Sequence, residues 1–261
     1  FKIDDYLFKR GLRLMQPMTL HLSKNSFNLV VLLLLTIIAG STVAAQDAPG
    51  YTVTIDPANF VTVVDNPYFP RIPGTKWVYE GQTADGLEHN ELEILTDTRE
   101  IMGVTTTVIH DVVNLDGVLI EDTLDFFAQD QDGNVWYFGE EVSNYRDGQL
   151  VDSEGSWEAG VDGALPGIVM YGDVAAHIGE TYRQEYYAGE AEDMGILLNN
   201  DGIVTVPYND SEFQDVVMTY DFTPLETDSH ELKYFAAGIG EVKSIDLVTR
   251  DEDVLIDFTA P

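Results

Sequence analysis

The chain has 261 residues, no cysteine, and 46 acidic against 13 basic side chains, which gives a formal net charge of −33. The lack of cysteine excludes disulfides, thiolate metal sites and thiol catalysis. A negative field of this strength repels phosphate backbones and anionic lipid surfaces, so nucleic acid and membrane-surface partners are not expected. A saline habitat and specific cation binding both account for such acidity, and composition alone does not choose between them.

The first 45 residues are interpreted as a part that is removed. Residues 1–17 read as upstream read-through, and Met18 begins a secretory signal with an apolar run at 29–39. This run is shorter than the roughly 20 residues that span a bilayer. Val43 and Ala45 suit a signal-peptidase site, so cleavage after Ala45 is predicted, with an uncleaved anchor as the alternative. The remaining chain, with 8 basic and 44 acidic residues and a net charge near −36, is expected to be secreted or periplasmic and not inserted in the membrane.

Residues 46–75 are rich in proline, asparagine and aromatic side chains, which predicts an extended leading segment before a single β domain at 76–261. Alternating polar and apolar residues predict strands at 76–82 and 88–96. A three-strand meander is then expected, with Asp-Gly turns between its strands. Its strands are predicted at 104–114, 118–129 and 134–143.

The second half of the domain continues the same short strands. One strand is expected to end near residue 154, another to cover 180–187, and the last to cover 253–258. Hairpins are expected around 200–202, 208–212 and 236–240. Residues 155–179 interrupt this pattern with several glycines and are expected to form a long loop over one opening of the sheet. The predicted fold is therefore all-β, an antiparallel meander forming a curved sheet or barrel-like half-shell with a long glycine-rich loop.

Acidic residues in and after the glycine-rich loop are the candidate metal ligands. Hard cations such as calcium take six to eight oxygen ligands, and loops with glycine wrap carbonyl and carboxylate oxygens around them. Calcium is the cofactor expected from this pattern. The alternatives are tyrosines that are simply core and acids that begin a small helix. The predicted ligands are Glu158, Asp162, Glu185, Glu192 and Asp193.

One strand carries a row of polar side chains. Alternation over 118–129 places Glu121, Thr123 and Asp125 on one face. This face is interpreted either as an ordinary solvent face or as a binding concavity, and the sequence leaves both open. Carboxylates mixed with aromatic rings also suit a carbohydrate or a cationic ligand, so Glu121 and Asp125, with Trp157 and Tyr186, are the candidate ligand-binding residues.

Catalytic motifs are not recognisable. The chain after residue 45 has His89, His110, His177 and His230, without a nucleophile elbow, phosphate loop or dinucleotide fingerprint. The turn at 130–134 partly imitates a calcium loop but fits a hairpin turn better. The leading expectation is a non-catalytic binding domain for a small cation or a carbohydrate. The alternatives are a secreted hydrolase that acts on polysaccharide through paired carboxylates and a structural component of an extracellular matrix or surface layer.

Four parts of the sequence stand out as strings, at 66–70, at 73–75, at 129–130 with 133–140, and at 155–164. These strings resemble a group of exported, acidic, β-rich bacterial proteins, and this resemblance implies no activity. The segment 234–242 is similar to a glycine turn in periplasmic curved-sheet proteins of the lipoprotein-carrier kind, which implies architecture only.

Overall fold

A computed structural model describes residues 50–261. The predicted read-through, secretory signal and cleavage site, and residues 46–49 of the leading segment, lie outside the described residues. Among residues 50–261, no helix is long and apolar enough to cross a bilayer.

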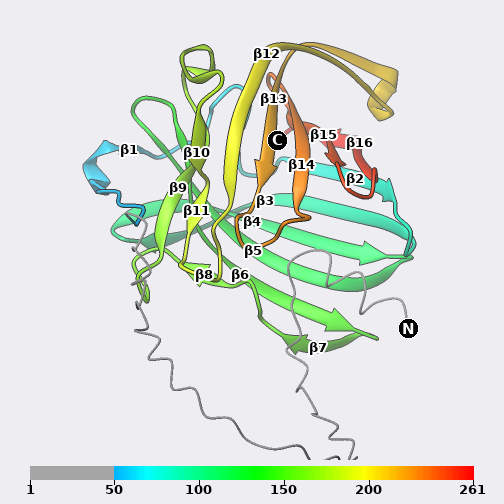
Figure 1. Ribbon diagram of the computed structural model, residues 1–261, viewed down its shortest axis with the longest axis horizontal. Coiled ribbons are helices and arrows are strands. Elements are labelled where there is room, and N and C mark those ends of the chain that lie inside the picture. The colour runs from blue at the N-terminus through cyan, green and yellow to red at the C-terminus, as the bar shows by residue number, and fades with distance from the viewer. Residues whose placement is uncertain (1–49) are drawn as a thin grey trace, which may run out of the picture.

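A single antiparallel sheet curls into a nearly closed barrel (Figure 1), which confirms the predicted fold class. Two meanders build it: β2 to β6 run side by side in chain order, and so do β12 to β16. The last strand, β16, pairs with β2, so the two halves of the chain join there. The bounds are β1 (Phe60–Val61), β2 (Lys76–Gln82), β3 (Leu87–Ile101), β4 (Val104–Leu115), β5 (Val118–Asp130), β6 (Val135–Arg146), β7 (Gln149–Asp152), β8 (Trp157–Glu158), β9 (Leu165–Met170), β10 (Thr181–Arg183), β11 (Glu185–Tyr186), β12 (Met194–Val206), β13 (Ser211–Phe222), β14 (His230–Ala236), β15 (Gly240–Asp246) and β16 (Glu252–Thr259), with 3₁₀ turns η1 (Pro57–Asn59), η2 (Val174–His177) and η3 (Tyr208–Asp210).

The first Asp-Gly corner of the first meander behaves as predicted, whereas at the second only Gly133 and not Asp132 has positive φ. Asp116 and Gly117 both have positive φ, at 49° and 77°, as a tight hairpin turn requires. The prediction of a hairpin around 200–202 is wrong, because β12 continues through these residues and pairs with β13 both before and after them. Register shifts near Asn199 and Gly202 show that the glycine marks an irregular pairing there instead of a turn. The strand expected at 180–187 is divided into β10 and β11.

The glycine-rich segment 155–179 does not lie over an opening of the barrel, contrary to expectation. It contains β8, β9 and η2, and both strands pair with β6. Gly139 of β6 permits this approach, since a Cβ there would lie 2.3 Å from the Trp157 carbonyl oxygen. The segment therefore extends the sheet: Trp157, Ala159 and Ala164 cover its outer face, while Met170 and Val174 pack with the apolar side chains inside the barrel.

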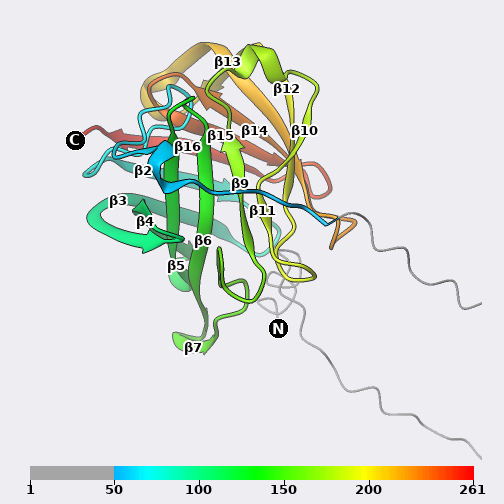
Figure 2. The same ribbon diagram turned by 90° about the vertical axis from the view of Figure 1, so that its left-hand side faces the viewer.

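Two apolar clusters result from this arrangement. The outer cluster lies between the sheet and the covering segments, and includes Ile101, Phe126, Phe138 and Trp157. In Figure 2 the blue leading segment crosses the outer side of β6 and β9, where the Tyr51 hydroxyl donates to the Pro166 carbonyl oxygen at 3.0 Å. The larger inner cluster fills one end of the barrel.

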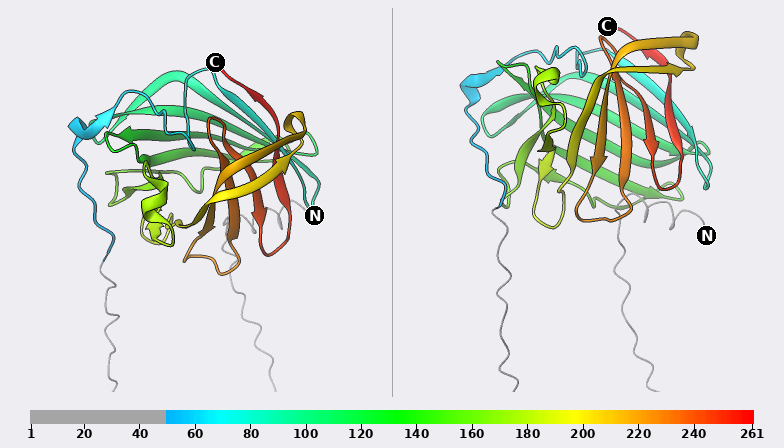
Figure 3. Two further views of the ribbon diagram at one scale, coloured as in Figure 1. Left: turned by 90° about the horizontal axis from the view of Figure 1, so that it is seen from above. Right: turned by 45° about the horizontal axis from the view of Figure 1, so that its top comes forward.

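The leading segment closes that end of the barrel. Phe69 packs there against Phe127 and Phe235. The Trp77 indole donates to the Ile239 carbonyl oxygen at 2.8 Å, and the Gly238 amide donates to the Pro67 carbonyl oxygen at 2.7 Å. The right-hand view of Figure 3 shows this light-blue segment at the upper end of the strands. Apolar side chains thus close this end of the barrel, and from here on this closed end is called the floor.

The turn that partly imitated a calcium loop is organised by Asp130, which is 4% exposed. Its carboxylate accepts from the amides of Asp132 and Asn134, from the Asn134 side chain and from the Trp136 indole, at 2.9 to 3.0 Å. Protein donors therefore occupy this carboxylate, as expected for a structural hairpin turn.

Replacing Asp130 by alanine is expected to lower the free energy of unfolding by about 3 kcal/mol, because four part-buried donors lose a charged acceptor. The exposed neighbour Asp132 is the matched control, and its alanine variant is expected to change stability by no more than about 0.5 kcal/mol. Urea unfolding measures both. Equal losses in the two variants would contradict the structural role of Asp130.

Candidate ligand-binding cavity

The barrel encloses a cavity of about 740 Å³ between the floor and the opposite end. That opposite end, called the mouth below, is formed by the hairpins at 82–87, 223–229 and 247–251, all of which contribute lining residues. Of the glycine-rich segment 155–179, only Gly155 lines the cavity. The volume of the cavity lies in the range of small-molecule binding sites.

Acidic side chains dominate the cavity wall. Among residues 50–261, fifteen aspartates and glutamates line it, while Arg71 and Lys233 are its only arginine and lysine. Several acids lie deep in the barrel because alternate residues of each strand face inward. Asp125 on β5 stands directly opposite Glu140 on β6, and Glu121 stands opposite Asn144. The wall therefore carries far more negative than positive groups.

The row of polar residues on β5 faces the interior of the barrel, but Thr123 and Asp125 are not in the cavity lining. Glu121 is in the lining, and the Tyr137 hydroxyl donates to Asp125 at 2.6 Å. Burial raises the pKa of Asp125 to about 6, although the hydrogen bond from Tyr137 acts in the opposite direction. Burial, followed by the neighbouring charge of Asp125, raises the pKa of Glu140 well above its usual value. Of this row, Glu121 therefore contributes to the cavity wall.

Glu185 and Asp193 meet on the side of the cavity made by β11 and β12. Glu185 is 8% exposed. Burial, and then the charge of Asp193, raises its pKa to about 8. Burial also raises the pKa of Asp193. The Glu185 carboxyl group therefore favours the protonated form near neutral pH.

Lys233, on β14, is a cation of the cavity wall. Its Nζ lies 3.6 Å from Asp221 Oδ2 and 3.5 Å from Glu231 Oε2. Burial lowers the pKa of Lys233, but the surrounding carboxylates outweigh burial and raise it well above its usual value. Burial raises the pKa of nearby Glu241 to about 7 despite the charge of Lys233. One ammonium group is thus shared by several acids.

Arg71 comes from the leading segment and stands at the floor. Its guanidinium lies 3.6 Å from the centre of the Phe69 ring and donates to the Pro70 carbonyl oxygen at 3.0 Å. Burial lowers its pKa to about 10, against the raising effect of Tyr79 and nearby carboxylates. Arg71 was not predicted as a site residue, because it precedes the regular strands.

The predicted metal ligands do not gather at one place. Glu185 and Asp193 share the cavity, but Glu158, Asp162 and Glu192 are not in its lining. Asp162 occupies a turn with φ of 49°, and Glu192 accepts from Arg183 at 3.3 Å. Within residues 50–261, no group of three or more histidine, aspartate or glutamate residues is placed to hold a metal ion.

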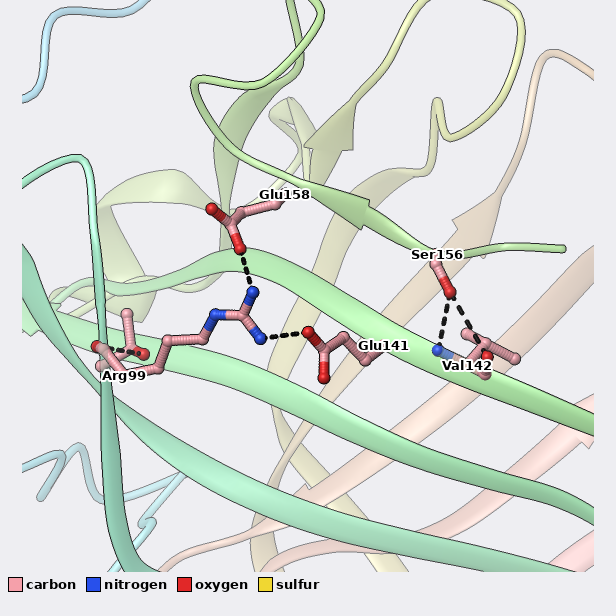
Figure 4. A network of polar contacts seen from close by, with 6 residues as sticks. Arg99, Glu141, Val142, Ser156 and Glu158 are labelled. Carbon is pink, nitrogen blue, oxygen red and sulfur yellow. Dashed lines mark hydrogen bonds and ion pairs between the residues drawn. The ribbon is translucent and has the colours of Figure 1, made fainter. Parts of the chain in front are cut away.

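Figure 4 shows why Glu158 lies apart. Arg99 on β3 forms ion pairs with both Glu141 on β6 and Glu158 on β8. The same guanidinium lies 4.6 Å from the centre of the Phe126 ring, in the outer cluster. Figure 4 also shows the Ser156 hydroxyl bound to the backbone of Val142, including a 2.8 Å bond from the Val142 amide. These contacts attach the glycine-rich segment to the outer face of the sheet.

The two predicted aromatic ligand residues also lie outside the cavity lining. Trp157 is 5% exposed and packs edge-on against Tyr137, with ring centres 5.3 Å apart. Tyr186 packs against Tyr51 at 5.8 Å and against the Arg183 guanidinium at 5.0 Å. Both rings therefore contribute to packing between segments.

In comparisons with known proteins, no family model, no curated protein and no solved structure matches the chain.

Proposed function

We propose that the protein is an exported, non-catalytic binding domain whose interior cavity holds a small organic cation. The observation that carries this proposal is the excess of carboxyl groups over Arg71 and Lys233 in the wall of a 740 Å³ cavity. A positive ligand supplies the missing counter-charge, and its attraction is strong because the wall is shielded from bulk water. An anionic ligand would meet repulsion on nearly every side.

An organic cation fits this site better than the calcium ion expected from the sequence. Calcium requires several oxygens converging within about 2.6 Å, and no acidic group of three or more residues converges in this way in the described part of the chain. The carboxyl groups are instead distributed around a space large enough for a molecule of several carbon atoms. Such a molecule contacts separated acids simultaneously.

Proton release is the expected signature of this binding. A cation beside Glu140 or Glu185 stabilises the charged carboxylate and so lowers its pKa. Each carboxyl group that was protonated in the ligand-free cavity then gives up a proton. Calorimetric titration in two buffers of different ionisation enthalpy at pH 7 counts the protons that leave.

The test uses putrescine as the probe, with calcium chloride and sodium chloride at matched ionic strength as comparisons. Wild-type protein is expected to bind putrescine and release protons, while a Glu140→Gln and Glu185→Gln double variant loses affinity by about tenfold or more. Glu91→Gln, at an exposed position on β3, is the control and should bind normally. Tight binding of calcium without putrescine binding would replace this proposal with the metal site. Equal responses to all three solutes would leave general charge screening as the only effect.

A further inference from the structure

The cavity wall contains an amide oxygen with an unusual position. Asn144, on β6 near the mouth, is 1% exposed and lines the cavity. Its Nδ2 donates to Asp152 Oδ1 at 2.8 Å and to the Glu154 carbonyl oxygen at 3.0 Å. These two bonds fix the orientation of the amide, so its oxygen points away from them. Asn144 Oδ1 has no hydrogen-bond partner among the described residues.

A second amide repeats this feature on another strand. Asn90 on β3 also lines the cavity, and its Oδ1 has no partner among residues 50–261. The side chain directly opposite Asn144 is Glu121, another acceptor. Buried acceptors left unpaired are costly, and a donor that enters the cavity removes the cost. These acceptors therefore select for hydrogen-bond donors in addition to positive charge.

We propose that the ligand is a cation with several N–H donors, such as a primary ammonium or guanidinium group, and that Asn144 Oδ1 and Glu121 receive it near the mouth. This inference depends on the proposed function and specifies its ligand class. A quaternary ammonium ion satisfies the charge of the wall but offers nothing to the amide oxygens. Discrimination between these two kinds of cation is the property that separates hydrogen-bond recognition from charge attraction alone.

The experiment compares putrescine with its hexamethylated, bis-quaternary analogue, which has the same charge and chain length. Wild-type protein is expected to bind putrescine about tenfold more tightly than the analogue. Asn144→Leu should lower putrescine affinity about tenfold and leave binding of the analogue within about twofold. Asp152→Ala removes a partner of Nδ2 but keeps the Asn144 oxygen, so it should preserve the preference.

Asn90→Leu provides a second measurement that does not involve the bonds to Asp152 and Glu154, and it decides the result if the Asn144 variant does not fold. It is expected to reduce the preference for putrescine as well. Equal affinities of the wild-type protein for the two probes would overturn this inference and leave the proposed function standing. Equal loss of both probes in the Asn144 and Asp152 variants would also overturn it, because that result indicates a structural role. Failure of both probes to bind would instead reject the proposed function.

Discussion

Replacing Lys233 by methionine is expected to destabilise the ligand-free protein by about 3 kcal/mol at pH 8. The ammonium group lies within 3.6 Å of Asp221 and Glu231, and its charge also acts on Asp193 and Glu241. Its removal leaves these carboxylates beside one another without a counter-ion. At pH 5 the loss is expected to be smaller, because carboxyl groups with raised pKa values take up protons.

Lys243→Met is the matched control for this measurement. Lys243 forms a single ion pair with Glu252 at 2.6 Å, and the Glu252 side chain is 49% exposed. Its replacement is expected to cost no more than about 1 kcal/mol, with little dependence on pH. Urea unfolding at pH 5 and pH 8 gives all four values. Equal losses for the two lysines at pH 8 would show that Lys233 does not compensate the cavity acids.

The second large effect is a fall in the stability of the ligand-free protein as pH rises from about 5 to 8. Glu185, Glu241 and Asp125 have pKa values raised to about 8, 7 and 6 in the folded protein. Between the ordinary pKa of an acid and its raised value, the folded state binds more protons than the unfolded state. The free energy of unfolding therefore decreases with pH across that interval, by roughly a few kcal/mol in total.

Glu185→Gln identifies one source of this dependence. The variant cannot lose a proton at position 185, so the decrease between about pH 6 and 8 should become shallower, while the part due to Glu241 and Asp125 remains. Chemical unfolding at constant ionic strength, repeated at each pH, provides the profile. A wild-type profile that stays level or rises over this range would mean that the acids are already ionised in the folded protein.

Most of the sheet follows from local sequence signals. The strand predicted at 76–82 coincides with β2, and those of the first meander differ from β4, β5 and β6 by a few residues at their ends. Alternating side chains and Asp-Gly corners act within a single hairpin, so they can be read without the rest of the chain. The pairing of β16 with β2 joins residues more than 170 positions apart, and no local pattern encodes it.

The cavity itself was harder to predict, and Glu140 shows why. Alternation counted from Tyr137 places Glu141 on the inner face, but the register shifts by one residue between Phe126 and Phe127. Gly139, with φ of 138°, accommodates this bulge and turns Glu140 inward. A bulge changes which residues face the interior, so simple counting gives the wrong face beyond it.

The other missed residues depend on tertiary structure. Lys233 meets Asp221 across the adjacent strands β13 and β14, but it shares a cavity with Glu121 and Glu140 only after the second meander has closed against the first. Arg71 reaches the floor only because the leading segment folds into the end of the barrel. By contrast, Glu121, Asp125, Glu185 and Asp193 could be selected from their acidity and position. The sequence could not show that Glu121 shares one cavity with Glu185 and Asp193.

The apolar floor has a consequence for exchange. Because side chains of the leading segment block the floor, the cavity is open at the mouth and closed at the other end. A ligand of the proposed kind would therefore enter and leave through the mouth. Entry and release of the proposed ligand would then both pass the hairpins at 82–87, 223–229 and 247–251.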